Sequence, residues 1–156
     1  MRFLFFDEIV SYEPGRRVLG KKTFAFDGAY FTAHFPRRPI VPASLVMESL
    51  AQVAGWFNYQ LHDRSVRMVV ALVESARLER HVRVGETLML DVALTYRHPD
   101  GATMRGVARS GDEVVGSVER MVFANQAAGA EGFSRRELEH YEYMTSGSPA
   151  LDGDRS

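Results

Sequence analysis

ASLVMESLAQVAGWFNYQL, residues 43–61, is the stretch that decides the fold. Apolar side chains cover most of its circumference when it is drawn as a helix: Leu45, Val46, Met47, Leu50, Ala51, Val53, Ala54, Trp56 and Phe57. A helix that is hydrophobic almost all round is enclosed by protein rather than laid on a surface. Pro42 precedes it, where a proline is compatible with a helix start. The stretch therefore predicts a long central helix.

The segments on either side of this helix predict antiparallel strands. Residues 3–12 and 17–26 are rich in aromatic and β-branched side chains and flank a Pro-Gly turn at residues 13–16, which is typical of a hairpin. Four more segments of strand character follow the helix: residues 66–73, 86–96, 102–109 and 114–124. Turn sequences at residues 98–101 and 110–113 separate the last three. We expect an α+β fold in which a curved antiparallel β-sheet wraps one long central helix.

Composition excludes several classes of protein. The 156 residues contain no cysteine, which removes disulfides, thiolate nucleophiles and zinc ribbons. The net charge of −1 provides no positive electrostatic field that would attract nucleic acid. No apolar run approaches the roughly 18 residues that cross a bilayer. We expect a cytoplasmic protein with no nucleic-acid partner and no membrane contact.

The composition changes near residue 125. Basic residues outnumber acidic ones up to Ala124, whereas acidic residues dominate from Asn125 onward. A capping-box pattern at residues 134–137 predicts one short helix, and the Ser-, Gly- and Asp-rich end that follows cannot bury enough apolar surface to order itself. We expect one domain at residues 1–124 and a C-terminal extension at residues 125–156 with a short helix and a disordered end.

A polar stripe interrupts the apolar helix. Ser44, Glu48 and Gln52 recur every four residues and therefore share one helix face. A carboxylate in apolar surroundings is less acidic than in water, so Glu48 is a candidate for holding a proton at neutral pH. A capping contact or a structural ion pair at a subunit contact is the alternative for this residue.

A stiff segment leads into the helix. Pro36, Pro39 and Pro42 restrict the backbone to extended geometry and hold His34 at a defined distance from the helix start. Unpaired backbone N–H groups and the positive end of the helix dipole gather there. An imidazole, an acid and an oxyanion site could therefore meet, although a lone histidine is more often structural.

Residues 34–52, HFPRRPIVPASLVMESLAQ, resemble the signature of the 3-hydroxyacyl-acyl-carrier-protein dehydratases, a FabZ/FabA-like family of the hot-dog fold. In that family His-Phe-Pro leads into Pro-Gly-x-Leu-x-x-Glu and Ala-Gln, and the 14-residue separation of His34 and Glu48 agrees with it. The similarity covers roughly residues 1–124. The glutamate indicates the branch that dehydrates, rather than the aspartate-bearing branch that also isomerises.

The resemblance implies a reaction and a role for each residue. His34 removes a proton from the carbon next to the thioester, and Glu48 protonates the departing 3-hydroxyl. Backbone N–H groups near Ala43 and Ser44 meet the enolate charge. Gln52 either orients the Glu48 carboxyl group or is an ordinary polar residue at an interface. The product is a trans-2-enoyl thioester in fatty-acid or related lipid or polyketide biosynthesis, made without a cofactor or a metal.

The resemblance also implies partners. An acyl carrier protein delivers the substrate, and Arg37, Arg38 and Arg80 are candidates for a basic rim that attracts it, with an ordinary solvated surface as the alternative for each. The active sites are shared within a homodimer, because His34 and Glu48 of one site come from different subunits. A trimer of dimers is a larger assembly that the family would allow.

Two departures from the family pattern keep other functions open. Ala33 and Ala43 stand where the family usually has glycine. Alanine keeps its backbone N–H, but its methyl group narrows a tunnel and disfavours a positive φ. A non-catalytic acyl-binding subunit therefore remains an alternative to the dehydratase. A hot-dog acyl thioesterase, which would cleave the thioester with water, is a second alternative, although the His-Phe-Pro lead-in argues against it.

Overall fold

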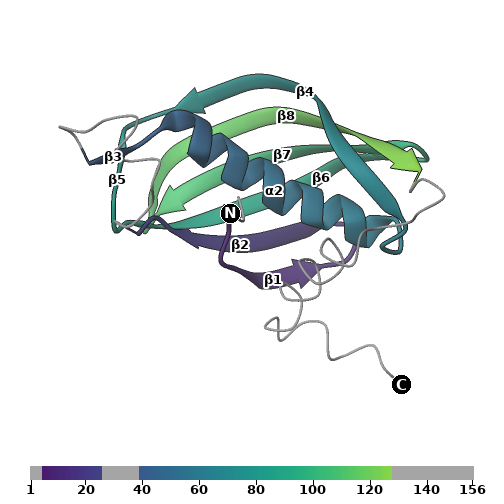
Figure 1. Cartoon of the computed structure of the whole chain (residues 1–156), viewed down its shortest axis with the longest axis horizontal. Helices are drawn as coiled ribbons and strands as arrows, with labels where there is room; N and C mark the ends of the chain where they lie inside the picture. The colour runs from purple at the N-terminus through teal and green to yellow at the C-terminus, as the bar shows by residue number, and fades with distance from the viewer. Residues whose placement is uncertain (1–4, 26–38, 128–156) are drawn as a thin grey trace.

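The structure, a computed structural model, describes residues 5–25 and 39–127. One long helix, α2 (Ala43–Leu61), lies across a curved antiparallel sheet (Figure 1), as the sequence predicts. The strands are β1 (Glu8–Glu13), β2 (Arg17–Thr23), β3 (Ile40–Val41), β4 (Val66–Leu78), β5 (Val82–Arg83), β6 (Thr87–His98), β7 (Gly101–Ser110) and β8 (Glu113–Ala127). The helix bounds agree with the sequence prediction, and its length matches the uninterrupted apolar pattern.

The large sheet has the strand order β1-β2-β6-β7-β8-β4. Tight turns connect β1 to β2, β6 to β7 and β7 to β8, whereas β4 follows α2 and pairs with β8 at the far edge. The sheet therefore has two edges, formed by β1 and β4. Every pair in it is antiparallel, as the predicted hairpins require.

β1 begins at Glu8, later than the predicted residue 3, and β4 and β8 extend three or more residues beyond their predicted ends. β4 continues from Val73 to Leu78, although this part of the sequence is polar, because its backbone still pairs with β8 and an ion pair between Glu74 and Arg120 (2.8 Å) links the two strands. β8 runs to Ala127, past the compositional change at Ala124, because it pairs there with the start of β4. The predicted short helix of the C-terminal extension lies outside the described residues.

The core lies between α2 and the face of the sheet that it crosses. The largest fully buried side chains come from both layers: Trp56, Phe57, Leu50, Phe6, Phe24, Ile9, Leu88, Leu90, Met104 and Met121. Each such side chain contributes about 1.5–3 kcal/mol by leaving water. Gly20 of β2 allows the closest approach, since a Cβ there would lie 2.7 Å from Cγ2 of Val53. The sheet can therefore follow the helix closely.

The two ends of α2 differ. At its C-terminal end, Nη2 of Arg97 donates a hydrogen bond to the Leu61 carbonyl oxygen (2.6 Å), and the Arg64 N–H donates to the Tyr59 oxygen (2.9 Å). At its start, Pro42 provides no side-chain cap, and the first turn contains no acidic residue. Neither Pro42 nor the first turn of the helix therefore provides a side chain that compensates the positive end of the helix dipole. No helix in the described ranges is long and apolar enough to span a membrane.

Within the single chain, one side of the first half of α2 is uncovered. Ser44 and Glu48 are exposed and Gln52 is half-buried, whereas the residues from Val53 to Tyr59 are buried. The reason is geometric: a sheet covers one side of a helix, and the polar stripe lies on the other side. Glu48 is thus open to solvent in the single chain.

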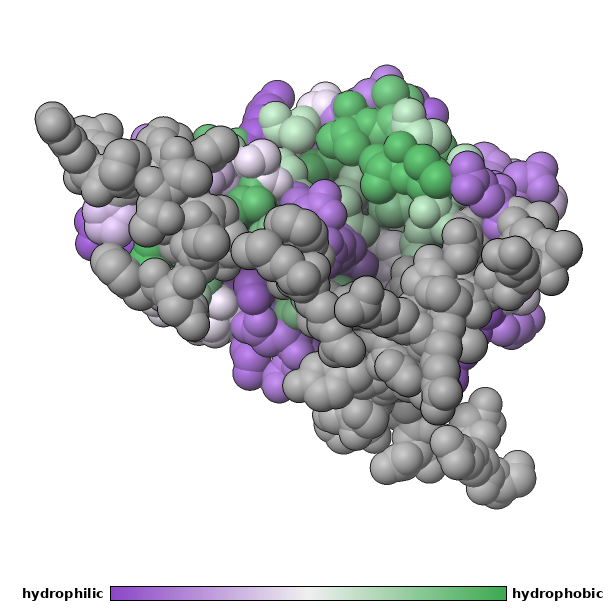
Figure 2. Space-filling view, viewed as in Figure 1, coloured by the Kyte–Doolittle hydropathy of each residue, from purple (hydrophilic) through white to green (hydrophobic). Residues whose placement is uncertain are grey.

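The edge strand β4 is unusually apolar. Four successive large side chains around Ala71 are each 40–45% exposed: Val69, Val70, Leu72 and Val73. Figure 2 shows the apolar patch over this strand, in the upper part of the view. A long apolar edge with unpaired backbone groups is a template for pairing with another chain. This surface is a candidate interface.

Candidate functional site

The structure brings four of the predicted site residues onto one helix. Ala43, Ser44, Glu48 and Gln52 follow the uncovered side of α2 from its first residue to its third turn. Arg80 lies in the turn between β4 and β5. The remaining predicted residues, His34, Arg37 and Arg38, lie outside the described residues.

A relay of hydrogen bonds holds the Glu48 carboxyl group. The Phe5 backbone N–H donates to Oε1 of Gln52 (2.8 Å), and Nε2 of Gln52 donates to Oε1 of Glu48 (2.8 Å). Because a backbone N–H can only donate, the first bond fixes which end of the Gln52 amide is oxygen. The amide nitrogen must then face Glu48. Oε2 of Glu48 has no hydrogen-bond partner among the described residues.

The start of α2 presents backbone donors close to this carboxyl group. The N–H of Leu45 donates a hydrogen bond to the Pro42 carbonyl oxygen (2.9 Å). The N–H groups of Ala43 and Ser44, which come before it, have no backbone acceptor among the described residues. Both residues are exposed. Two N–H groups at the positive end of a helix form a site that favours negative charge. A carboxyl group and two backbone N–H groups without a described backbone acceptor thus lie within two turns of one helix.

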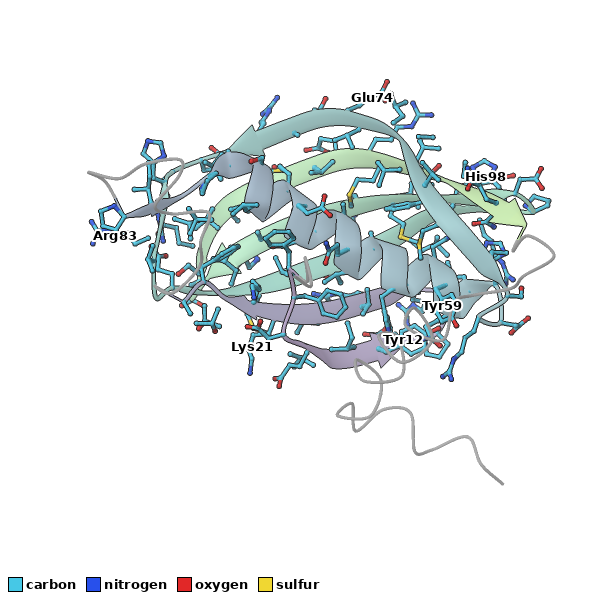
Figure 3. The ribbon with its side chains drawn as sticks, in the orientation of Figure 1. Tyr12, Lys21, Tyr59, Glu74, Arg83 and His98 are labelled. Carbon is cyan, nitrogen blue, oxygen red and sulfur yellow. The ribbon has the colours of Figure 1, made fainter. Side chains whose placement is uncertain are left out.

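A small sheet fixes the direction from which the chain enters the helix. β3 pairs with β5, with Ile40 opposite Arg83 and Val41 opposite Val82. Val41 and Val82 are fully buried. Figure 3 shows Arg83 at this end of the molecule, away from Tyr12, Tyr59 and His98. Sequence reasoning did not predict this sheet, because two-residue strands are too short for a periodic pattern.

Arg80 and Glu86 form the most connected polar group near the helix start. Nη2 of Arg80 lies 2.9 Å from Oε2 of Glu86, and Nη1 lies 3.2 Å from Oε1. Nε of Arg80 donates to Oε2 of Glu113 (2.7 Å), and Nη1 also donates to the His81 carbonyl oxygen (2.8 Å). Glu86 further accepts from the Arg83 N–H (2.7 Å) and from Oγ of Ser110 (2.8 Å). We refer to Arg80, Glu86, Ser110 and Glu113 as the Arg80–Glu86 cluster.

Electrostatics keep this cluster ionised. Hydrogen bonds from Arg80 are the main cause that lowers the pKa of Glu86 from 4.5 to about 2, and bonds from the Arg83 N–H and Ser110 add to the effect. The same pairing with Glu86, and then with Glu113, raises the pKa of Arg80. Three nitrogens of Arg80 are occupied within the chain. The sequence analysis named Arg80 as a candidate site residue but did not name Glu86. The only feature in the sequence that marks Glu86 is its position directly after the turn glycine Gly85.

The other end of the helix is closed by aromatic packing. Tyr12 of β1 makes edge contacts with the rings of Trp56 (5.3 Å between centroids) and Phe57 (5.7 Å). Desolvation is the main cause that raises the pKa of the Tyr12 phenol. Tyr12 therefore stays neutral and contributes packing.

A groove lies on the opposite face of the sheet. A groove of about 450 Å³ runs over β2, β6, β7 and β8, and an ion pair between Arg17 and Asp91 forms part of its wall. Asp91 alternates with buried Leu90 and Val92, so the groove lies on the sheet face away from α2. Within residues 5–25 and 39–127, no three His, Asp or Glu side chains are placed to hold a metal ion.

Comparison with known proteins places the chain in a family. The model of the FabA-like domain matches residues 1–119. A "3-hydroxyacyl-[acyl-carrier-protein] dehydratase FabZ" from Acidovorax sp. (strain JS42) is 36% identical over 124 residues, which cover 76% of this chain and 85% of that protein. The protein of the same name from Clostridioides difficile (strain 630) is 33% identical over 120 residues, which cover 76% of this chain and 84% of that protein.

Solved structures show the same architecture at low identity. A dehydratase heterocomplex, ApeI:P from Xenorhabdus doucetiae, has a TM-score of 0.64 at 13% identity and covers 88% of both chains. A Streptococcus mutans UA159 protein bound to acetyl CoA has a TM-score of 0.63 at 13% identity, covering 81% of this chain and 93% of that one. At this identity the likeness concerns the fold, and it confirms the predicted hot-dog arrangement of one helix on a curved sheet.

The lowered pKa of Glu86 gives a prediction for stability against pH. A carboxyl group whose pKa is lower in the folded state stabilises that state above its unfolded pKa, and the contribution disappears as pH falls through the folded pKa. Urea unfolding should show wild type more stable than Glu86→Gln by a constant margin from pH 7 to 5. The margin should close between pH 4.5 and about 2.

Glu119→Gln is the matched control, because Glu119 is exposed and makes no ion pair with a described residue. Its difference from wild type should be small at every pH. A margin for Glu86→Gln that stays unchanged down to pH 2.5 would show that the carboxylate does not carry this stabilisation.

Proposed function

The chain belongs to the FabA-like domain family, and on that basis we propose that it dehydrates 3-hydroxyacyl thioesters of acyl carrier protein to trans-2-enoyl thioesters in fatty-acid biosynthesis or a related pathway. The relatives at 36% and 33% identity carry this activity in their names. The observation that carries the proposal is the placement of Glu48. It is held by Gln52 on the uncovered side of α2, next to a helix start with open backbone donors.

The proposed reaction divides the work between two side chains. The neutral imidazole of His34 accepts the proton from C2 of the substrate, and the electrons of that bond form the enolate. The C2–C3 double bond then forms as the C3–O bond breaks, and protonated Glu48 gives its proton to the leaving hydroxyl, which departs as water. Solvent exchange afterwards moves a proton from imidazolium to carboxylate. General acid–base steps of this kind each contribute about 100- to 10,000-fold.

The helix start is proposed to stabilise the enolate. Negative charge on the thioester oxygen would be met by the N–H groups of Ala43 and Ser44, which are open in the described part of the chain. The absence of an acid from the first turn keeps this end of the helix positive. Donors that are already oriented cost no reorganisation when the charge develops.

Gln52 is proposed as a positioning residue for Glu48. Its amide is held from one side by the Phe5 N–H and bonds Oε1 of Glu48 on the other. This contact supports the orienting role over that of an ordinary polar residue. With Oε1 engaged, Oε2 is the oxygen that would carry the catalytic proton.

A homodimer would complete the site. In the single chain Glu48 is exposed, whereas a proton-bearing acid needs dry surroundings. The end of β4 lies beside the first half of α2, since the Cβ that Gly116 lacks would contact both Met47 of the helix and the Arg77 carbonyl oxygen of β4. The exposed apolar side chains lie earlier on the same strand. A second copy that pairs along β4 would cover the apolar side chains and bring protein over the polar stripe. It would also supply the histidine of each site.

Carrier-protein recognition is proposed to use the basic residues near the helix start. Arg37 and Arg38 precede β3 in the chain, and Arg80 lies in the turn before β5. The hydrogen bonds of Arg80 are made inside the chain, so it would add positive charge to this rim rather than a free hydrogen-bond donor. Arg83, also at this end, is exposed and forms no ion pair with a described residue.

The catalytic pair can be tested by complementation. We expect His34→Ala and Glu48→Gln to lower kcat at least about 100-fold each while the dimer remains folded. A heterodimer of the two variants, isolated with two affinity tags, should regain about half of the wild-type kcat, because one of its two sites then has both functional residues. Formation of the trans-2-enoyl thioester is the assay.

The control is a heterodimer of wild type with the His34→Ala/Glu48→Gln double variant. Each of its sites lacks one residue, so it should stay inactive if sites are shared between subunits, and should be half active if each subunit forms its own site. Release of free thiol instead of an enoyl thioester would indicate a thioesterase. Wild type without turnover on any acyl chain length would indicate a non-catalytic acyl-binding subunit.

The role of Gln52 has its own test. Gln52→Leu should lower kcat about tenfold with KM nearly unchanged, because the substrate still binds while the carboxyl group loses its fixed orientation. Gln60→Leu, two turns further along the same helix, is the matched control and should keep wild-type kcat. Equal kcat values in the two variants would assign Gln52 to packing alone.

The edge of β4 predicts the oligomeric state. Leu72→Lys and Val73→Lys place charges on neighbouring residues that point to opposite faces, and each should shift the protein from dimer to monomer and abolish turnover. Thr95→Lys, at an exposed position of β6, should remain an active dimer. Light scattering during gel filtration gives the mass. Dimers of normal activity for both β4 variants would exclude this edge as the interface.

A further inference from the structure

We propose that the ion pair between Arg80 and Glu86 is a positioning device that sets the helix start and both flanks of the His34 segment for catalysis. This inference rests on the proposed dehydratase function. In the proposed mechanism Glu86 contacts neither the substrate nor Glu48. Its inferred role is to set the geometry of the site.

The Glu86 carboxylate ties three parts of the chain together. Its two oxygens accept from Arg80 in the turn after β4, from the Arg83 N–H in β5 and from Oγ of Ser110 at the end of β7. Arg80 extends the link to Glu113 at the start of β8 (2.7 Å). The turn at residues 84–86 is thereby anchored to the large sheet through charge-assisted bonds, which are about twice as strong as neutral ones.

From β5 the constraint passes to the helix start. β5 pairs with β3, and the Val84 N–H donates to the Pro39 carbonyl oxygen (3.3 Å). Only Pro42 separates β3 from α2. Since a proline has a fixed φ, a displacement of β3 is passed on to the N–H groups of Ala43 and Ser44.

The same turn also holds the other flank of the His34 segment. The Phe24 N–H donates to the Glu86 carbonyl oxygen (3.3 Å), and the Gly85 N–H donates to the Phe24 oxygen (2.6 Å). The Phe24 side chain is fully buried. Phe24 and Pro39 thus bound the chain segment that contains His34, and both are bonded to residues 84–86. One anchored turn therefore sets where this segment leaves the sheet and where it returns.

A charged pair suits this task better than apolar packing. The turn is near the surface, with Glu86 and Arg80 partly exposed, and it has few buried side chains to fix its position. The planar guanidinium and the carboxylate engage through two parallel bonds, which specify direction as well as distance. A misplacement of about 1 Å in an active site can cost about 100-fold in rate.

The experiment compares Glu86→Gln with Asp91→Asn in the full-length protein. Asp91 forms an equally bidentate pair with Arg17 (2.6 and 2.5 Å), but it joins β2 to β6 on the face away from α2. We expect Glu86→Gln to lower kcat about 10- to 100-fold with KM within about twofold of wild type, and to remain dimeric. Asp91→Asn should keep the wild-type kcat. Arg80→Lys, which cannot form the bidentate pair, should resemble Glu86→Gln.

Hydrogen–deuterium exchange gives a readout that does not depend on activity. In Glu86→Gln, peptides covering residues 39–47 and 82–88 should exchange at least about tenfold faster than in wild type, with peptides of β1 unchanged. In Asp91→Asn the peptides covering residues 39–47 should exchange as in wild type.

The outcomes separate this inference from the proposed function. An active wild type with unchanged kcat and unchanged exchange in Glu86→Gln would overturn the positioning role and leave the dehydratase intact. An inactive wild type would overturn the function, and the exchange of residues 39–47 would then decide by itself whether Glu86 holds the helix start. A fall in kcat with no change in that exchange would also overturn the inference, because the effect would not pass through the helix start.

Discussion

A curved sheet can cover only one side of the helix that it wraps, and the rest of the structure depends on this constraint. The second half of α2 is buried around Trp56 and Phe57, where the sheet follows the helix closely. The first half keeps Glu48 on its uncovered side. The same geometry leaves the apolar edge of β4 open. The single chain therefore leaves both the Glu48 side chain and the apolar edge strand exposed.

The polar groups near the helix start form two sets of contacts. Gln52 holds Glu48 directly, and its own orientation is fixed by a backbone donor from Phe5. Further out, Glu86 and Arg80 anchor the turn from which β3 and the helix start are positioned. The two sets of contacts differ chemically: a neutral amide bonds the Glu48 carboxyl group, whereas an ion pair of Arg80 and Glu86 anchors the backbone of the turn.

The sequence resemblance and the geometry support each other at particular residues. Membership of the FabA-like family, matched over residues 1–119, is independent of where any side chain points. The relay to Glu48 and the uncapped start of α2 come from the structure and are what a general acid and an oxyanion site would need. The substitution of alanine at position 43 preserves the backbone N–H on which that oxyanion site depends.

The sequence by itself determined the helix from Ala43 to Leu61, the antiparallel strands and the polar stripe with Glu48, because periodicity and turn residues are local signals. It also determined the family. Only the tertiary structure decided that the stripe faces away from the sheet, that β4 runs on to Leu78 and that Glu86 joins Arg80. These features depend on which strands become neighbours and on how far a sheet reaches around a helix, and such long-range relations leave no periodic trace in the chain.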